Sequence, residues 1–241
     1  STSNELEFFP AWWLPEAHSQ TLWNARVRRV PSVNLLGETL ELPDQDFLEW
    51  FWLKDTYEAS AEVPTILILH GLEGCARSNY VQDLMRQLGS LRWRTVVIQY
   101  RNCGEKPNRL AQSYHAMRWQ ELDWTVENFR GRFPEAPIGV VGFSIGGSIL
   151  LNWLGQNEIK NIAAACAISV PYKLAPCADR LNQGFSKIYQ QYLMGRLKRS
   201  AVRKWALLKD ALGLSDLSQI RDLKTLREFD DLLTAPLHSF R

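Results

Sequence analysis

A five-residue segment near the middle of the chain has the residue types that a nucleophilic serine requires. Gly142-Phe143-Ser144-Ile145-Gly146 begins at the end of the apolar run Ile138 to Phe143 and precedes a helix-like run. A serine on a sharp turn between a strand and a helix is held in a strained backbone conformation that exposes its hydroxyl. Side chains at Gly142 and Gly146 would collide in so tight a turn. The spacing therefore predicts Ser144 as a nucleophile, and a buried serine in a tight turn is the alternative.

A second glycine-containing segment is expected to face that serine. His70-Gly71-Leu72-Glu73-Gly74 follows the apolar run Thr65 to Leu69, and the second half of an oxyanion hole comes from the loop after an earlier strand. Main-chain N–H groups at the start of a helix also favour a developing negative charge. We predict that the N–H groups of Leu72 and Ile145 form an oxyanion hole, with Gly71 as the glycine of the loop.

The sequence offers no convincing base for the serine hydroxyl, which needs a partner that accepts its proton. His70 precedes the serine, and a histidine in such a loop more often braces the backbone. His238 is the only histidine after the serine, and it lies three residues from the end of the chain. No strand-like run precedes it, and Asp230 and Asp231 fall in the same predicted helix. Neither histidine is predicted as the base.

Short apolar runs alternate with amphipathic segments from residue 64 onward, which is typical of a parallel sheet covered by helices on both faces. The predicted strands are Thr65–Leu69, Thr95–Tyr100, Ile138–Phe143 and Ile162–Ser169. Two buried helical stripes are predicted between them, one formed by Val81, Leu84, Met85 and Leu88, and the other by Trp119, Leu122, Val126 and Phe129. Residues 38–53 predict a hairpin with its turn at Pro43 to Asp46. The fold class is therefore α/β.

Three regions are expected along the chain. Residues 1–37 form an aromatic N-terminal arm, rich in tryptophan and proline, which we expect to lie packed over the body; contact with a membrane surface is the less favoured alternative. Residues 38–171 form the α/β core. Residues 172–241 carry helical spacing and form either a cap over the site or the last helices of the domain. The basic cluster at 196–204 is more often a solvated helix face than an anion site, and no function is assigned to it.

The overall composition fits one large globular domain and excludes several classes of function. The formal net charge of +2 is too small to indicate binding to nucleic acid, and no segment reaches the roughly 18 apolar residues of a spanning helix. The four cysteines show neither C-x-x-C pairs nor zinc-like spacing to histidine, so no metal is expected and reduced thiols in the cytoplasm are favoured. Cys75 in particular is expected to be a small packed residue rather than a rival nucleophile.

Several motifs, spread over nearly all of the chain, together resemble the YheT-like branch of the α/β-hydrolase superfamily. Members of this branch are expected to be esterases. The motifs are Pro10-Ala11-Trp12-Trp13-Leu14, His18-Ser19-Gln20-Thr21, His70-Gly71-Leu72-Glu73-Gly74, Tyr114-His115, Gly142-Phe143-Ser144-Ile145-Gly146-Gly147 and Phe229-Asp230-Asp231-Leu232-Leu233-Thr234-Ala235. The resemblance implies an α/β-hydrolase fold, with Ser144 as the nucleophile of a triad. It also implies carboxylic esters of short or medium acyl chain as substrates.

The chain departs from the pattern of that family in three places. Asn102 stands where the family commonly has glycine, and Ser148 stands where asparagine usually follows the glycines. Family members also continue past the Phe229 to Ala235 motif through two more strands that bear the catalytic aspartate and histidine. At roughly 30 residues per strand–helix unit, the resemblance implies about 60 to 100 further residues. The acid and base are accordingly expected beyond Arg241.

Two classes of function follow from these expectations. The first is an esterase that forms an acyl-enzyme at Ser144, acts on a small-molecule ester and uses neither a metal nor an organic cofactor. Thioesterase, lipase, amidase and perhydrolase chemistry use the same motif and stay open. The second is a noncatalytic binding or interaction protein with a hydrolase fold, which the absent acid and base favour for these 241 residues. Acyl length and oligomeric state are left open.

Overall fold

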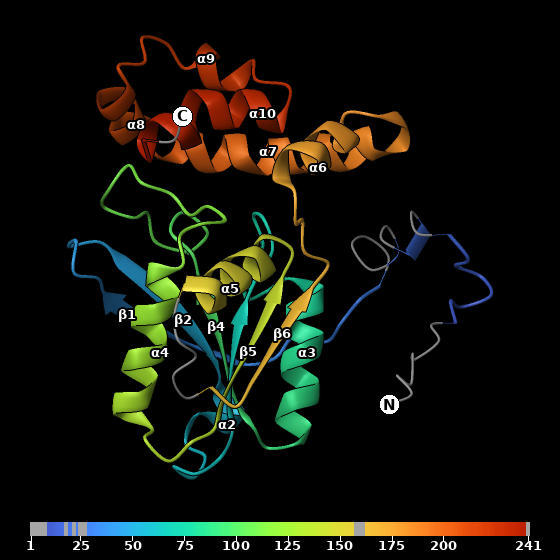
Figure 1. The fold of residues 1–241 in the computed structure, drawn as a ribbon, viewed down its shortest axis with the longest axis vertical. Coiled ribbons are helices and arrows are strands. Elements are labelled where there is room, and N and C mark those ends of the chain that lie inside the picture. Colours follow the sequence, from blue (N-terminus) through green and yellow to red (C-terminus); the bar gives the residue numbers. More distant parts are fainter. Residues whose placement is uncertain (1–8, 17–18, 21–22, 24–27, 157–161, 240–241) are drawn as a thin grey trace.

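The computed structural model describes residues 9–16, 19–20, 23, 28–156 and 162–239 (Figure 1). Six strands form one sheet in the order β1-β2-β4-β3-β5-β6. The strands are β1 (Leu35–Glu41), β2 (Phe47–Leu53), β3 (Thr65–Leu69), β4 (Arg94–Gln99), β5 (Ile138–Phe143) and β6 (Ala164–Ile168). Strands β3 to β6 pair in parallel, whereas β2 runs antiparallel to both β1 and β4. The prediction of a mostly parallel α/β sheet is confirmed.

The predicted elements of the core agree with the structure to within two residues at most strand ends. Strands β3 and β5 have the predicted bounds, and the predicted hairpin is the β1–β2 pair, in which Glu41 lies opposite Phe47. Strand β4 begins one residue earlier than predicted, at Arg94, although arginine is rarely buried. The Arg94 guanidinium stacks on the Phe133 ring at 3.9 Å and donates to the main-chain oxygen of Ala59 at 2.6 Å, so burial leaves its charge with partners.

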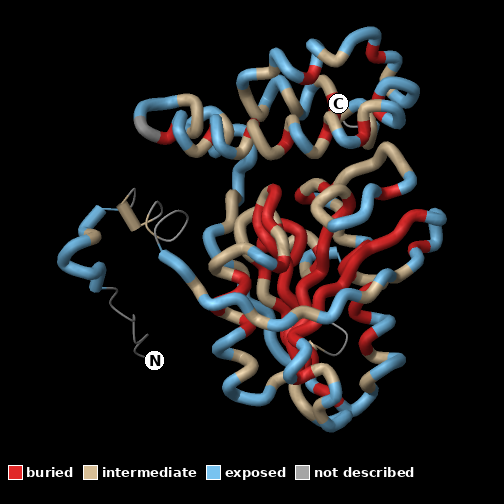
Figure 2. The backbone as a smooth tube through the Cα atoms, turned by 180° about the vertical axis from the view of Figure 1, so that it is seen from behind, coloured by how far each residue is buried: buried red, intermediate tan, exposed pale blue. Residues whose placement is uncertain are grey.

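Apolar side chains on the two faces of the sheet pack against different helices, so the core lies in two layers. Helices α4 (Gln120–Arg132) and α5 (Ile145–Gln156) cover one face, where Leu67 and Leu69 are buried. Helix α3 (Asn79–Ser90) covers the other face, where Ile66 and Ile68 are buried. This alternation follows from the two-residue period of a strand. The inner strands β2 to β5 are the most continuously buried part of the chain, as the red core in Figure 2 shows, whereas β1 and β6 are largely exposed or half-buried.

A helical segment comes after the last strand and lies beyond the carboxyl ends of β3 and β5, above the sheet in Figure 1. Its elements are α6 (Leu174–Leu181), η2 (Gly184–Ser186), α7 (Lys187–Arg203), α8 (Trp205–Leu212), α9 (Ser218–Arg221), α10 (Leu226–Phe229), η3 (Asp230–Thr234) and α11 (Ala235–Leu237). It has a small core of its own around Ile220 and Leu233. Among residues 171–239 the structure has no strand, as predicted.

The expectation that the aromatic arm packs over the body is wrong for its most apolar side chains. Phe9 is 76% exposed and Trp12 is 90% exposed. The end of the arm contacts the body, where the Arg28 guanidinium binds the Asp83 carboxylate of α3 at 2.8 Å. Tryptophan and proline content favours an irregular segment, but it does not determine whether a complementary apolar surface exists. Phe8 lies outside the described residues.

Helices of the described residues are too short or too polar to cross a membrane. All four cysteines are free thiols. Cys75 is half-buried in the turn before α3, where its N–H donates to Ser78 Oγ at 3.0 Å. The cytoplasmic location stays a prediction.

Candidate active site

Ser144 occupies the single-residue connection between β5 and α5 and has a left-handed backbone conformation. Its φ is 52°, a value that serine adopts at a cost because its Cβ crowds the following carbonyl oxygen. Two hydrogen bonds hold it there: its N–H donates to Ile168 of β6 at 2.8 Å, and its carbonyl accepts from the Ser148 N–H at 3.1 Å. The strained turn is therefore fixed by the sheet on one side and by the helix on the other.

The glycines around Ser144 allow β5, α5 and β3 to approach one another more closely than alanine would. A Cβ atom at Gly142 would lie 2.5 Å from the carbonyl oxygen of Gly146. A Cβ atom at Gly146 would lie 2.5 Å from the carbonyl oxygen of Leu69. Both neighbours are main-chain atoms that cannot swing aside, so a methyl group at either position requires the strand–turn–helix unit to shift.

The loop after β3 lies against Ser144 and is held by two tyrosines. A Cβ atom at Gly71 would lie 3.3 Å from Ser144 Cβ, which measures how closely the loop approaches. Tyr80 Oη accepts from the Gly71 N–H at 2.9 Å, and Tyr114 Oη accepts from the Glu73 N–H at 2.7 Å. The N–H of Leu72, between these two, makes no hydrogen bond within the described residues.

Neither tyrosine was assigned a role from the sequence. Tyr114 belongs to one of the family motifs, but only the fold brings its hydroxyl to a loop 41 residues away. Tyr80 is the second residue of α3 and has no sequence signal that links it to Gly71. Both phenols have a raised pKa because they are buried, so they stay neutral and able to hold the loop at neutral pH.

A cavity of about 820 Å³ lies between this edge of the sheet and the helical segment. Ser144, Leu72 and Ile145 line it from the sheet side, and Leu193, Leu197 and Phe229 are among the side chains that line it from the helices. Most of the lining is apolar, which is typical of sites that take small organic ligands. The structure therefore brings four of the predicted site residues, Gly71 included, to the lining of one cavity, whereas Gly142 and Gly146 do not line it.

His70 braces the loop, as the sequence predicted. It is fully buried; its Nδ1 donates to the Gly71 oxygen at 2.8 Å, and its Nε2 accepts from the Tyr100 N–H at 3.5 Å. Burial lowers the pKa of His70 to about 4, so the ring is neutral at physiological pH. Because both ring nitrogens are already used, His70 has no free nitrogen with which to accept a proton from a serine.

The other two described histidines contact each other rather than Ser144. The rings of His115 and His238 lie 4.4 Å apart, and His238 Nε2 accepts from the Ser113 N–H at 3.4 Å. Burial lowers the pKa of each to about 4. Ser144 Oγ makes no hydrogen bond to any described residue. His238 directly follows the helical run η3–α11, which contains Asp230 and Asp231 and ends at Leu237.

The two substitutions relative to the family pattern are accommodated differently. Asn102 has a φ of 72°, a left-handed conformation in which glycine is favoured and asparagine is tolerated. Its N–H donates to Asn108 Oδ1 at 2.7 Å, which holds the turn. Ser148 is buried at the start of α5, and its hydroxyl has no hydrogen-bond partner among the described residues.

The basic cluster is not a uniformly solvated helix face, so that expectation is wrong in part. Lys204 is only 5% exposed and donates through Nζ to the main-chain oxygens of Leu110 and Gln112. Burial lowers its pKa to about 8. Arg196 is half-buried beside the loop that carries Glu73. The helical periodicity was sound, but it does not reveal that this stretch of α7 faces two loops of the core.

Residues that could hold a metal ion are not gathered anywhere in the described part of the chain, where no group of three or more histidine, cysteine or acidic side chains has a suitable arrangement. The cavity is thus lined by apolar side chains with a few polar groups. The polar groups in this lining include the hydroxyls of Ser144 and Tyr114, the Glu73 carboxylate and the Lys204 ammonium group.

Comparisons with known proteins agree with this geometry. Residues 64–236 match the family model described as the alpha/beta hydrolase fold. The chain is 33% identical over 240 residues to the Escherichia coli (strain K12) protein named "Putative esterase YheT", covering 99% of this chain and 70% of that protein. It is 27% identical to the mouse (Mus musculus) protein "Phospholipase ABHD3", covering 97% of this chain and 58% of that protein.

Solved structures support the fold. The esterase Pf2001 of Pyrococcus furiosus superposes with a TM-score of 0.52 at 18% identity, over 86% of this chain and 78% of that one. The chain spans 70% of the E. coli relative and somewhat more than half of the mouse phospholipase. The family model, which matches most of the chain, and the identity to the E. coli relative together confirm the resemblance. This chain belongs to the alpha/beta hydrolase family and, within it, is related to YheT.

Proposed function

We propose that the protein is a serine hydrolase that cleaves carboxylic esters of short or medium acyl chain, with Ser144 as the nucleophile. The observation that carries this proposal is the placement of Ser144: a left-handed residue between β5 and α5, on the wall of a largely apolar cavity. A buried serine in a tight turn would not need to face such a cavity. The relatives named esterase and phospholipase support hydrolysis of an ester.

In the proposed reaction, Ser144 Oγ attacks the ester carbonyl carbon while its proton passes to a base. The carbonyl oxygen becomes negative and accepts hydrogen bonds from the N–H groups of Leu72 and Ile145. The alkoxide then leaves with a proton, and water hydrolyses the acyl-enzyme to release the acid and free Ser144. Two features support these donors: Leu72 lies between two anchored N–H groups, and Ile145 begins α5, whose positive dipole end faces the cavity.

The base is the part of the site that the described residues do not provide. His70 is used on both ring nitrogens, and His115 and His238 contact each other. The proposed reaction therefore needs an imidazole and a supporting carboxylate from outside the described residues. We propose further that helices α6–α11 act as a cap whose apolar side chains receive the acyl chain.

Covalent labelling tests the nucleophile directly. The protein expressed from its complete reading frame is treated with a fluorophosphonate probe, and the labelled peptide is identified by mass spectrometry. Label is expected on Ser144 and is expected to disappear in Ser144→Ala. A folded protein that takes no label at Ser144 would refute the proposal. p-Nitrophenyl esters from acetate to palmitate then measure acyl preference, with the highest kcat/KM expected for short or medium chains.

A noncatalytic binding function is the second candidate, because Ser144 Oγ has no hydrogen-bonded base within the described residues. Its test uses the 241-residue chain itself, incubated with p-nitrophenyl butyrate. Loss of the base from the catalytic triad of a serine protease lowers kcat by roughly a millionfold. We therefore expect no turnover above the rate measured in buffer alone. Turnover that disappears in Ser144→Ala would overturn this second candidate and would show that the residues present suffice.

A further inference from the structure

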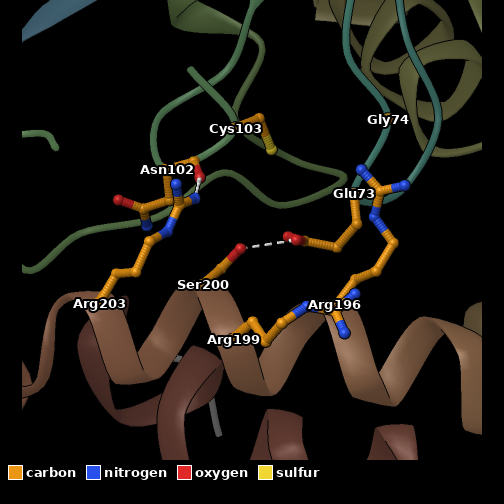
Figure 3. Close-up of a pocket in the computed structure, with 8 residues that line it drawn as sticks. All are labelled: Glu73, Gly74, Asn102, Cys103, Arg196, Arg199, Ser200 and Arg203. Carbon is orange, nitrogen blue, oxygen red and sulfur yellow. Dashed lines mark hydrogen bonds between the residues drawn. The ribbon is translucent and has the colours of Figure 1, made fainter. Parts of the chain in front are cut away.

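A second, smaller cavity of about 280 Å³ opens beside the large one (Figure 3). Its lining comes from α7, the loop after β3 and the loop after β4. The lining includes Glu73, Asn102, Arg196, Arg199, Ser200 and Arg203. Glu73, Asn102 and Ser200 line the large cavity as well, so the two cavities meet at these side chains. A ligand in one is therefore within reach of the other.

Three arginines give the small cavity an excess of positive charge. Arg196, Arg199 and Arg203 recur at intervals of three and four residues, which places them on one face of α7. Within the described residues none of them forms an ion pair, although Arg196 donates to Tyr192 Oη at 3.0 Å and Arg203 donates to the Asn102 oxygen at 3.0 Å. In Figure 3, Arg196 and Arg203 extend from α7 toward the loops of the core.

The single carboxylate in this cavity does not cancel that charge. Glu73 is 7% exposed, and its two oxygens are occupied: Oε2 accepts from Ser200 Oγ at 2.7 Å and Oε1 accepts from Tyr114 Oη at 3.3 Å. Burial raises the pKa of Glu73, which further weakens its negative charge. Even when Glu73 is ionised, three guanidinium groups face one carboxylate, and two positive charges stay unbalanced.

We propose that this small cavity binds the phosphate group of a phosphorylated ester substrate whose acyl chain lies in the large cavity. A phosphate monoester dianion matches the excess of two positive charges, whereas a carboxylate would leave one unbalanced. Guanidinium groups also bind phosphate oxygens through paired N–H donors. The cavity has room for roughly nine water molecules, enough for a phosphate and the atoms that link it to an ester.

The position of the cavity relative to the proposed oxyanion hole supports a role in substrate binding. Glu73 lines the small cavity and directly follows Leu72, the proposed oxyanion donor. A phosphate bound there would therefore fix the ester carbonyl close to Ser144. This part of the inference rests on the proposed function, whereas phosphate binding itself does not require turnover.

Equilibrium binding to the Ser144→Ala protein, expressed from its complete reading frame, tests the proposal without any turnover. Isothermal titration calorimetry at low salt measures the Kd of four compounds: inorganic phosphate, sn-glycerol 3-phosphate, 1-butyryl-glycerol 3-phosphate and acetate. We expect the butyryl ester to bind most tightly, because it occupies both cavities. We expect the Kd of acetate to be at least about tenfold higher than that of inorganic phosphate. Equal Kd values for inorganic phosphate and the butyryl ester would overturn the role in substrate binding. Equal Kd values for acetate and inorganic phosphate would overturn the preference for phosphate.

Two matched variants locate the binding. Replacing Arg199 and Arg203 together by glutamine should weaken binding of the butyryl ester at least about tenfold. Lys187→Gln is the control, because Lys187 is exposed on the same helix and lines neither cavity. It should leave Kd within about twofold. Unchanged binding in the double variant would overturn the proposal. If the double variant does not fold, Arg199→Gln alone, which removes no hydrogen bond to a described residue, should weaken binding at least about threefold.

A labelled Ser144 together with no phosphate binding would reject this cavity and leave the proposed hydrolase intact. Phosphate binding that depends on Arg199 and Arg203, with no label on Ser144, would support this cavity and reject the proposed hydrolase. The two proposals therefore fail separately.

Discussion

Gly146→Ala offers a sharp test of how closely the turn at Ser144 is packed. The added Cβ would lie 2.5 Å from the Leu69 oxygen and 2.7 Å from the His70 oxygen, in place of a contact of about 3.5 Å or more. Helix propensity alone would make alanine better than glycine here by about 1 kcal/mol, since Gly146 is the second residue of α5. Overpacking of this kind costs about 1–3 kcal/mol or more, and main-chain neighbours leave little room for relaxation. We expect a net loss of about 2 kcal/mol of unfolding free energy.

The matched control is Gly131→Ala in α4, where a Cβ would meet no described atom within 4 Å. That variant should be unchanged or more stable by about 0.5–1 kcal/mol. Urea unfolding followed by tryptophan fluorescence measures both variants, since the chain has 10 tryptophans. Equal stability of the two variants would refute the steric account of the turn, because the local helix effect is the same in both.

Three further perturbations test the strain, the histidine and the buried charges. Ser144→Gly should be more stable than Ser144→Ala by about 1 kcal/mol, because only glycine adopts a φ of 52° without strain; equal urea midpoints would count against strain at this residue. His70 has a pKa of about 4 in the folded protein against an ordinary value of 6.5, so the unfolded chain binds more protons between these pH values. The neutral buried ring therefore contributes about 3 kcal/mol to the unfolding free energy above pH 6.5, and this contribution is lost as the pH falls to 4. A His70→Gln variant should show a shallower loss of unfolding free energy over that pH range. Arg101→Met should cost about 3–5 kcal/mol of unfolding free energy, because it leaves the buried Asp46 carboxylate without its ion pair and leaves Glu121 paired with Arg118 alone. Arg101→Lys should recover part of that loss in the same urea assay.

Much of the core could be predicted because its signals are local. The period of two in Ile66 to Leu69 assigns alternate side chains to opposite faces of β3, and α3 and α4 show the helical period in their buried stripes. The turn at Ser144 could be predicted for a similar reason, since the glycines that it needs are two residues away on either side. Strand β4 begins one residue earlier than predicted because the Arg94 guanidinium stacks on the Phe133 ring, a contact that no local sequence pattern reveals.

The sequence by itself determined the α/β core, its order of strands and helices, and the serine turn, because each depends on sterics and periodicity among near neighbours in the chain. Only the tertiary structure decided that Tyr80 and Tyr114 hold the loop beside Leu72, that Lys204 is buried, and that the arginines of α7 face Glu73. These contacts join residues far apart in the chain; Ser200 and Glu73, for example, are 127 positions apart. Their existence depends on how separate elements pack, and the composition of each element does not specify which surface it will meet.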